Sequence, residues 1–294
     1  MAELKTTIIR KYEEDGYVHV PAALSPIDLE PMRGVVARAV DQHARDLLAE
    51  GVIADLLEGE TFERRLAAIY QGRDIGLRDW NDALFGRELY ELVTHPGILD
   101  VLEQVLGPEI SFDGAFHLRP KLPESKLTAF PWHQDSQYYG SPTQHMHIVT
   151  VTISLVELTE DNGCLWMIPG SHRWGYLEGE RGADQNFVTY ENVEERHPPV
   201  PVPMKLGDIM PFTNLTFHAS RINRTNGVRW TLDIRYSPTF GSRPVSGLER
   251  EAYEYRLGKL KAGGHVPFVV RSREGRTISW EEWKASVEWL NRKK

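Results

Sequence analysis

The pattern of apolar residues changes near residue 109, and this change limits the folds that the chain can adopt. Before it, apolar residues recur at helical spacing; after it, short runs rich in β-branched and aromatic residues are separated by Gly, Pro and Asn. The clearest runs are 147–157, 209–219 and 228–236. Short strands separated by turn residues are typical of two packed antiparallel sheets or a barrel. We therefore predict a mainly β fold with flanking helices, whose core is formed by residues 109–240.

Helices are predicted mainly in the N-terminal part, residues 1–108. Ser25 followed by Pro26 and Asp28 is typical of a helix start. Two further short helices are predicted over 81–94 and 97–106. Apolar residues follow Ser25 at helical spacing, namely Leu29, Met32, Val35, Val36, Val40 and Leu47 or Leu48.

The C-terminal part, residues 245–294, is predicted as a helical extension, in which Ser279 and Glu282 form a capping box before the last helix. Residues 176–198 are polar and charged with few periodic apolar positions, so we expect a long loop over the core that could act as a lid. Because composition shows no shift that would divide the chain, we expect residues 1–294 to form a single domain.

Charge and cysteine content exclude several kinds of partner and site. The 42 acidic residues outnumber the 34 basic ones, giving a net charge of −8, and no long Lys/Arg run appears, which argues against a nucleic-acid or anionic-membrane partner. We find neither a secretory signal nor an apolar run of about eighteen residues, so we expect no membrane span. The single cysteine, Cys164, excludes an intramolecular disulfide and an all-cysteine metal site. We expect a cytoplasmic protein with Cys164 in its core; the sequence predicts no particular oligomeric state.

A His-x-Asp triplet, His133 to Asp135, can form a metal site with the later His218. Residues two apart on a strand point to the same face, so a strand here would direct His133 and Asp135 into the core while Gln134 points away. His218 lies in an apolar run that we expect to be buried, and metal binding compensates the burial of an imidazole. Two imidazoles and one carboxylate on one face of octahedral Fe(II) leave the other face open for a chelating cosubstrate and dioxygen. Spacing alone leaves other partners for the triplet open among the 11 histidines, namely His145, His147, His172 and His197.

Arg229 follows His218 by eleven residues on an alternating strand and would face the interior of the core. A buried guanidinium needs an anion, and its planar fork suits the far carboxylate of a dicarboxylate cosubstrate. A two-residue turn at Asn226-Gly227 would place Arg229 too far from His218, so we predict a wider loop over about 221–227 that brings Arg229 beside Ser220. The alternatives are a surface salt bridge for Arg229, and Arg235 as the anion-binding residue.

Several motifs resemble those of the phytanoyl-CoA dioxygenase family. They are the triplet His133-x-Asp135, the run Asn162-Gly163-Cys164 to Pro169-Gly170-Ser171-His172, Gly207-Asp208 before an apolar strand, and His218-Ala219-Ser220 followed by Arg229. The resemblance covers about residues 8–240 and implies a double-stranded β-helix core, which is a jelly-roll or cupin-like fold. It also implies an enzyme that uses Fe(II), 2-oxoglutarate and O2.

By that resemblance, His133, Asp135 and His218 are the catalytic iron ligands. Arg229 binds the distal carboxylate of 2-oxoglutarate, and further cosubstrate contacts fall on Thr152, Ser220 and His117. The presence of Asp135 argues against the related halogenases, which have a small residue there. We place Trp132, Gln137, Tyr138 and Tyr139 near the substrate, although aromatic residues beside a site equally often pack its wall.

The resemblance predicts oxidation of a small organic molecule, with hydroxylation and release of succinate and CO2 as the leading outcome. An acyl-CoA substrate is the first alternative, but no basic cluster awaits its phosphates; a free molecule such as a natural-product intermediate is preferred. A non-catalytic jelly-roll protein that binds a metal or ligand is the second alternative. A Zn(II) hydrolase is the third, and it would have no need of Arg229.

Overall fold

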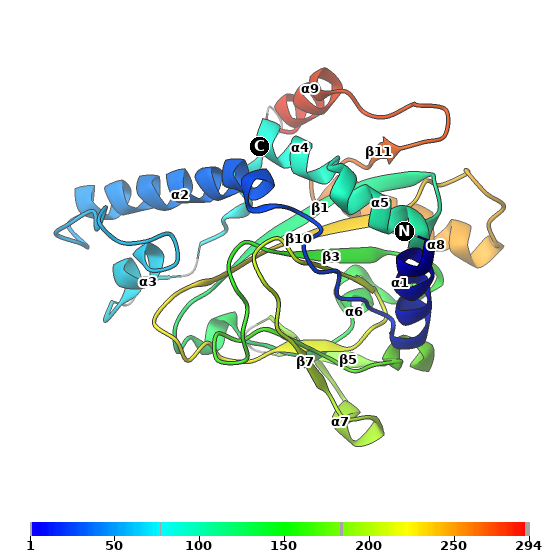
Figure 1. The fold of residues 1–294 in the computed structure, drawn as a ribbon, viewed down its shortest axis with the longest axis horizontal. Helices are drawn as coiled ribbons and strands as arrows, with labels where there is room; N and C mark the ends of the chain where they lie inside the picture. The colour runs from blue at the N-terminus through cyan, green and yellow to red at the C-terminus, as the bar shows by residue number, and fades with distance from the viewer. Residues whose placement is uncertain (1, 74, 77, 183–184, 292–294) are drawn as a thin grey trace.

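Two antiparallel sheets form the core of the molecule, which the computed structural model describes for residues 2–73, 75–76, 78–182 and 185–291 (Figure 1). The five-stranded sheet has the order β11 (Phe268–Arg271), β1 (Ile110–Lys121), β10 (Arg229–Pro238), β3 (Val149–Ser154) and β8 (Ile209–Thr213). The four-stranded sheet has the order β2 (Phe130–His133), β9 (His218–Ser220), β4 (Leu165–Met167) and β7 (Val200–Val202). From β1 to β4 and from β7 to β10, successive strands switch between the sheets, which is the connectivity of a jelly roll. The predicted double-stranded β-helix is confirmed.

Two of the predicted strand runs differ in detail from the structure. The run 209–219 is not one strand: β8 ends at Thr213 and β9 begins at His218 in the other sheet. Between them the chain turns, and the hydroxyls of Thr213 and Thr216 lie 2.9 Å apart. The run 147–157 forms a strand only over Val149–Ser154.

The wide loop predicted over about 221–227 is confirmed. Since β9 and β10 belong to different sheets, Asn226-Gly227 is not a two-residue hairpin turn between paired strands. Asn223 shapes the loop, because its buried side-chain amide donates to the carbonyl oxygens of Lys121 at 2.9 Å and Gly227 at 2.7 Å.

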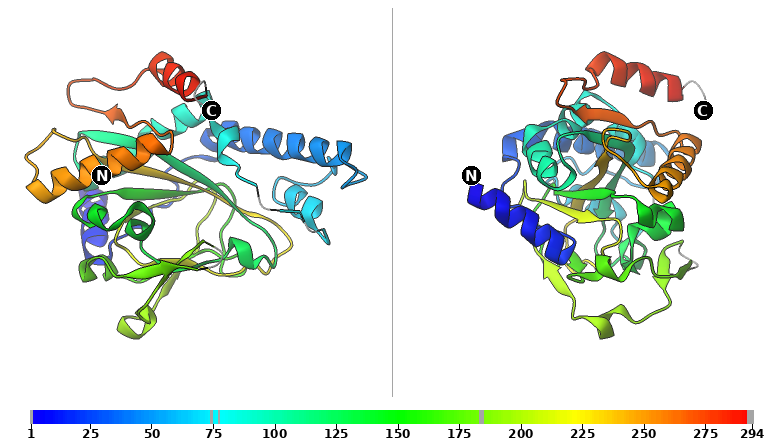
Figure 2. Two further views of the ribbon diagram at one scale, coloured as in Figure 1. Left: turned by 180° about the vertical axis from the view of Figure 1, so that it is seen from behind. Right: turned by 90° about the vertical axis from the view of Figure 1, so that its right-hand side faces the viewer.

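Helices cover the outer face of the five-stranded sheet (Figures 1 and 2). Ser25 caps the longest of them, sharing a capping box with Asp28 as the sequence predicts, and the predicted apolar positions up to Leu47 are buried while Leu48 is exposed. The predicted helix over 81–94 is wrong as one unit, because an extended Gly86 separates a short 3-10 helix from α4. The N-terminal elements are α1 (Ala2–Asp15), α2 (Pro26–Ala49), α3 (Arg65–Tyr70), η1 (Asn81–Leu84), α4 (Arg87–Val93) and α5 (Pro96–Leu106).

Strand β10 shows how this arrangement produces a polar interior. Its even-numbered residues from Trp230 to Tyr236 belong to the apolar core, and Trp230 contacts the helical layer through Trp80 and Phe62 with ring centroids 6.0 and 5.9 Å apart. Its odd-numbered residues therefore face the space between the sheets. Four of the five line one internal cavity: Arg229, Thr231, Asp233 and Arg235.

The C-terminal extension contains α8 (Gly247–Ala262), β11 and α9 (Trp280–Asn291). The capping box of Ser279 and Glu282 starts α9 as predicted. Strand β11 extends the five-stranded sheet beside β1, and Trp283 stacks on Phe112 with centroids 5.5 Å apart. The extension is thus packed onto the core.

Residues 176–198 contain more structure than the predicted loop. They include the hairpin of β5 (Gly179–Arg181) and β6 (Phe187–Thr189) and the one-turn helix α7 (Val193–Arg196), which projects from the four-stranded side of the molecule (Figure 1). This segment is tied to β2, because the Trp132 indole donates to Glu194 at 2.7 Å and the Thr189 hydroxyl donates to the Trp132 carbonyl at 3.3 Å. No helix among the described residues is long and apolar enough to span a bilayer.

Candidate metal centre

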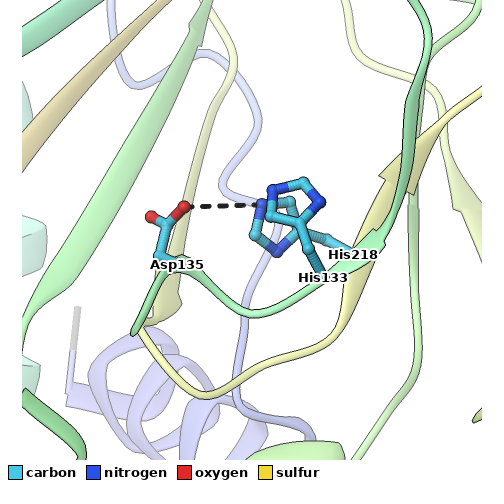
Figure 3. A group of neighbouring side chains, drawn as sticks. All are labelled: His133, Asp135 and His218. Atoms are coloured by element: carbon cyan, nitrogen blue, oxygen red, sulfur yellow. Dashed lines mark ion pairs between the residues drawn. The ribbon is translucent and has the colours of Figure 1, made fainter. Parts of the chain in front are cut away.

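His133, Asp135 and His218 meet at one end of the cavity between the sheets (Figure 3). One ligand atom of each side chain lies within 4.8 Å of the other two. The imidazole centroids are 4.2 Å apart, and His218 Nε2 lies 3.8 Å from Asp135 Oδ1. All three residues are buried. Within the described part of the chain, no other group of three His, Cys, Asp or Glu side chains has this geometry, so the alternative histidines do not join the triplet.

The backbone brings the three ligands together by a different route from the one predicted. His133 ends β2 and lies opposite His218 in the antiparallel register. Asp135 does not lie on this strand; it is the first residue of α6 (Asp135–Tyr139). The argument from strand alternation was therefore wrong for Asp135. Gln134, between them, is fully buried, and its amide bonds three backbone groups, Gly175 O, Leu215 O and Leu177 N, which fixes the turn from strand to helix.

Backbone carbonyls orient both imidazoles. His133 Nδ1 lies 2.8 Å from Pro131 O, and His218 Nδ1 lies 3.0 Å from Thr216 O. A carbonyl only accepts, so each Nδ1 carries the proton and each Nε2 keeps its lone pair for a metal. Burial, and then the neighbouring His218, lower the pKa of His133 to about 3. His133 is therefore a neutral imidazole, the form that binds metals.

Hydrogen bonds hold one oxygen of Asp135 and leave the other for a ligand. Oδ2 accepts from the hydroxyls of Thr150 and, at 3.0 Å, Tyr139, while Oδ1 faces His218. Burial opposes the charge of this carboxylate, but the guanidinium of Arg235 and the two imidazoles outweigh burial and keep its pKa below the ordinary value. Asp135 is thus an ionised carboxylate with one oxygen directed at the two imidazoles.

Arg229 and Ser220 present unsatisfied polar atoms to the same cavity. Arg229 Nη1 donates to Thr231 Oγ1 at 2.9 Å, but the buried Arg229 Nε and Ser220 Oγ have no hydrogen-bond partner. Burial lowers the pKa of Arg229 to about 10, which still leaves it charged at neutral pH. Among the described ion pairs, none supplies Arg229 with a carboxylate. Such groups normally have partners, so the pair is suited to an anionic ligand.

Arg235 has partners of its own. Its Nε donates to Tyr139 Oη at 2.9 Å, and its Nη1 contacts His117 Nδ1. Tyr139 and His117 thus engage Nε and Nη1 of Arg235, whereas Nε of Arg229 has no partner. The geometry therefore favours Arg229 over Arg235 as the anion-binding residue. His117 faces Arg235 and is not among the residues that line the cavity. Thr152 lines the cavity, but its hydroxyl donates to Asp233 Oδ1 at 2.7 Å.

The four residues predicted near the substrate have different surroundings. Gln137 is buried and its amide bonds Leu177 O and Thr189 Oγ1, so it joins α6 to the 176–198 segment. Tyr139 bonds Asp135. Tyr138 lies edge-on to the His133 ring, with centroids 5.2 Å apart, and is partly exposed; Trp132 is engaged by Glu194. Of the four, Tyr138 is therefore the one best placed to meet a substrate.

Arg119, Phe130 and Asp233 are among the cavity-lining residues that sequence reasoning missed. Strand alternation could have found two of them. Asp233 shares the face of Arg229 on β10, and Arg119 shares that of His117 on β1. Arg119 Nε donates to Asp233 Oδ2 at 3.1 Å.

Comparisons with known proteins agree with this geometry. The family described as Phytanoyl-CoA dioxygenase (PhyH) matches residues 12–231, well over half of the chain. A Caenorhabditis elegans protein named probable phytanoyl-CoA dioxygenase is 31% identical over 159 residues, which are 51% of this chain and 50% of that protein. Human peroxisomal phytanoyl-CoA dioxygenase is 26% identical over 235 residues, which are 77% of this chain and 66% of that protein. The chain thus spans half to about two thirds of the length of these relatives.

A solved structure supports the fold. The epimerase SnoN, crystallised with Fe3+, alpha-ketoglutarate and nogalamycin RO, has a TM-score of 0.53 and 22% identity, over 84% of this chain and 94% of that one. At this identity the likeness establishes a common fold.

Proposed function

Because the chain belongs to the phytanoyl-CoA dioxygenase family, we propose that it is a non-haem iron dioxygenase that uses 2-oxoglutarate as cosubstrate. The proposed reaction oxidises a small organic molecule, in the first instance by hydroxylation, and releases succinate and CO2. Support comes from the metal centre and from the anion-binding groups that share its cavity.

The side chains present fit Fe(II). Two neutral imidazoles and one ionised carboxylate form the donor set, and His133, Asp135 and His218 would hold the ion. The carbonyls and hydroxyls behind them fix the donor atoms before a metal arrives. When bound, the iron supplies the activation of dioxygen that oxidises both 2-oxoglutarate and the substrate.

Arg229 and Ser220 would bind the distal carboxylate of 2-oxoglutarate. The free Arg229 Nε and Ser220 Oγ are donors, and the carboxylate supplies the acceptors that they lack. Four apolar residues also line the cavity and limit the entry of water to the reacting groups: Phe130, Leu165, Phe212 and Ala219.

One observation carries this proposal: a buried guanidinium, whose Nε has no hydrogen-bond partner, lies in the same cavity as a two-histidine, one-carboxylate cluster. A Zn(II) hydrolase would need the cluster but not the guanidinium. A non-catalytic binding protein would be expected to bind metal or ligand without producing succinate. The pairing of the two features favours the dioxygenase.

The decisive experiment measures succinate formed from 2-oxoglutarate by the purified protein. Formation that requires both Fe(II) and O2 is expected; metal binding without any succinate would refute the enzyme and favour a binding protein. His133→Ala should abolish Fe(II) binding, whereas Arg229→Ala should mainly raise the 2-oxoglutarate concentration required.

Two arginine variants complete this test. Arg235→Ala should affect metal binding more than 2-oxoglutarate binding, since Arg235 contacts the Tyr139 that holds Asp135. An effect of Arg235→Ala on 2-oxoglutarate equal to that of Arg229→Ala would move the clamp to Arg235. Arg221→Ala, an exposed arginine that lies over Trp166, is the control and should change neither.

A free small molecule remains the proposed type of substrate, and a natural-product intermediate is its leading class. The proposal is supported by the likeness of fold to SnoN, which was solved with nogalamycin RO. Residues 176–198 are the proposed lid, supported by their contacts with β2 and α6 next to the metal ligands. The acidic chain and its single cysteine support a cytoplasmic location.

A further inference from the structure

We propose that the substrate of this enzyme carries an anionic group, in the simplest case a carboxylate, that pairs with Arg119 at the mouth of the cavity. This inference rests on the proposed function, since it concerns the part of the cavity that metal and 2-oxoglutarate do not use.

Arg119 lies between solvent and the metal centre. It is on the inward face of β1, opposite Thr231 of β10, and it lines the cavity together with the three metal ligands. Its side chain is 32% exposed, whereas Arg229 and Arg235 are each 3% exposed. The guanidinium lies 4.8 Å from the ring centroid of Phe130, another cavity residue, so it is held at the opening.

Most of the hydrogen-bonding capacity of Arg119 is unused. Only its Nε has a partner, Asp233 Oδ2 at 3.1 Å; within the described residues, neither terminal nitrogen has one. The same Asp233 carboxylate also accepts from Thr152 at 2.7 Å, so it serves two donors. The two free nitrogens form the fork that binds a carboxylate.

The charges of the cavity leave one positive charge unmatched. Its lining includes three arginines and two aspartates. A divalent metal and dianionic 2-oxoglutarate cancel each other, so loading both preserves that excess. The cosubstrate would engage Arg229. Burial opposes the charge of Arg235, but its neighbours Tyr139, Asp135 and Asp233 outweigh burial and raise its pKa. The unmatched positive charge is therefore available to a substrate at Arg119, although the net charge of the whole chain is −8.

A second cation lies beside aromatic rings that contact the metal centre. Tyr138 contacts His133, and Phe187 of the 176–198 segment contacts Tyr138 with centroids 5.0 Å apart. The exposed Arg181 lies 4.9 Å from the Phe187 centroid, and its Nη1 donates to the backbone oxygen of Gln185. A row of contacting aromatic rings with arginines beside it is complementary to a molecule with an apolar body and an anionic group.

The simpler explanation is that Arg119 only forms a salt bridge with Asp233. A partly exposed pair of this kind contributes little to stability. The two explanations therefore predict different ligand preferences but similar stability of the fold, so the experiment measures the preference for anionic ligands.

The test uses the anaerobic complex of wild-type protein with Fe(II) and 2-oxoglutarate. Binding of each probe is measured from the change in the charge-transfer absorption and in the melting temperature of this complex. The probes are 3-phenylpropanoate, octanoate and cyclohexanecarboxylate, each paired with its methyl ester. At least one acid is expected to bind, about 10- to 150-fold more tightly than its ester, which is the effect of a charge-assisted hydrogen bond. Arg119→Met should abolish this preference with 2-oxoglutarate affinity unchanged, Arg119→Lys should keep part of it, and Arg221→Met should keep all of it.

Any of three results would overturn the inference. The esters could bind as tightly as their acids, the preference for the acid could survive in Arg119→Met, or none of the three acids could bind. The proposed function fails separately, at an earlier step. If wild-type protein shows no charge-transfer absorption with Fe(II) and 2-oxoglutarate before any probe is added, the cosubstrate assignment itself is wrong.

Discussion

Replacing Arg229 with methionine should raise the melting temperature of the metal-free protein and at the same time remove its response to 2-oxoglutarate. Burial lowers the pKa of Arg229 well below its ordinary value, to about 10, which corresponds to about 3 kcal/mol of unfavourable burial of the charged form. Because the folded-state pKa lies below the unfolded one, this cost applies in full at neutral pH and is relieved only above about pH 10.

Methionine can fill the space of the arginine stem without the charge. The substitution loses the hydrogen bond to Thr231, which contributes about 1 kcal/mol. The net gain is then about 2 kcal/mol, or roughly 4 to 8 °C in melting temperature for a chain of this size. With 2-oxoglutarate the order reverses: wild-type protein should gain about 2.7 kcal/mol at a ligand concentration 100 times its Kd, and the variant should gain at most about 0.4 kcal/mol.

The assay is thermal unfolding with and without Mn(II) and 2-oxoglutarate, together with titration of 2-oxoglutarate. Its Kd should rise at least about 100-fold in Arg229→Met, because two charge-assisted hydrogen bonds are lost. Arg224→Met, an exposed arginine in the same connecting loop, is the control and should leave both quantities unchanged. A lower melting temperature of metal-free Arg229→Met combined with an unchanged Kd would refute the reasoning, since Arg229 would then be a structural residue.

Three further substitutions test the surroundings of the site. Tyr139→Phe removes a hydrogen bond to the carboxylate ligand and should weaken Co(II) binding about 10- to 100-fold in a spectroscopic titration, with the circular dichroism unchanged. Burial, and then neighbouring guanidinium groups, lower the pKa of Lys121 from 10.5 to about 6. Between these two pH values the unfolded chain binds more protons than the folded one, so the free energy of unfolding rises with pH, by up to about 1.4 kcal/mol per pH unit. Lys121→Met should remove this contribution in urea unfolding at pH 7, 8 and 9; an unchanged slope would contradict it. Gly140→Ala combines a φ of +109° with a Cβ only 2.2 Å from Tyr255 Oη, and it should lower the melting temperature more than the control Gly275→Ala, where φ is +70° but no atom lies within 4 Å.

The parts of the fold that could be predicted from the sequence are those set by local patterns. Ser25 starts a helix because its capping box lies within four residues, and the β10 strand follows from its alternation. The same alternation already contains part of the site, because it places Arg229 and Asp233 on one face. The comparison of distances along a strand was also sufficient to predict the wide loop before Arg229.

The remaining features depend on contacts between distant segments. Asp135 leaves the strand because Gln134 bonds Leu215 and the 175–177 backbone, and none of these partners is a neighbour in the sequence. The run 209–219 contains Pro211 within β8, but no Gly or Pro between Thr213 and His218 marks where one sheet gives way to the other. Similarly, alternation could place Arg119 inside the barrel, but only its partners show that two of its nitrogens are free.

The groups around the cavity come from opposite layers of the barrel. His133, His218 and Ser220 belong to the four-stranded sheet, whereas Arg229 belongs to the five-stranded sheet. A metal held by the two imidazoles of the first sheet and a cosubstrate held in part by Arg229 of the second would therefore join the layers through a removable cross-link. The strands β2 and β9 are short, so they have few backbone hydrogen bonds with which to resist separation. Binding of metal and cosubstrate would thus restrict the separation of the two sheets, so an occupied site would make the barrel more rigid than an empty one.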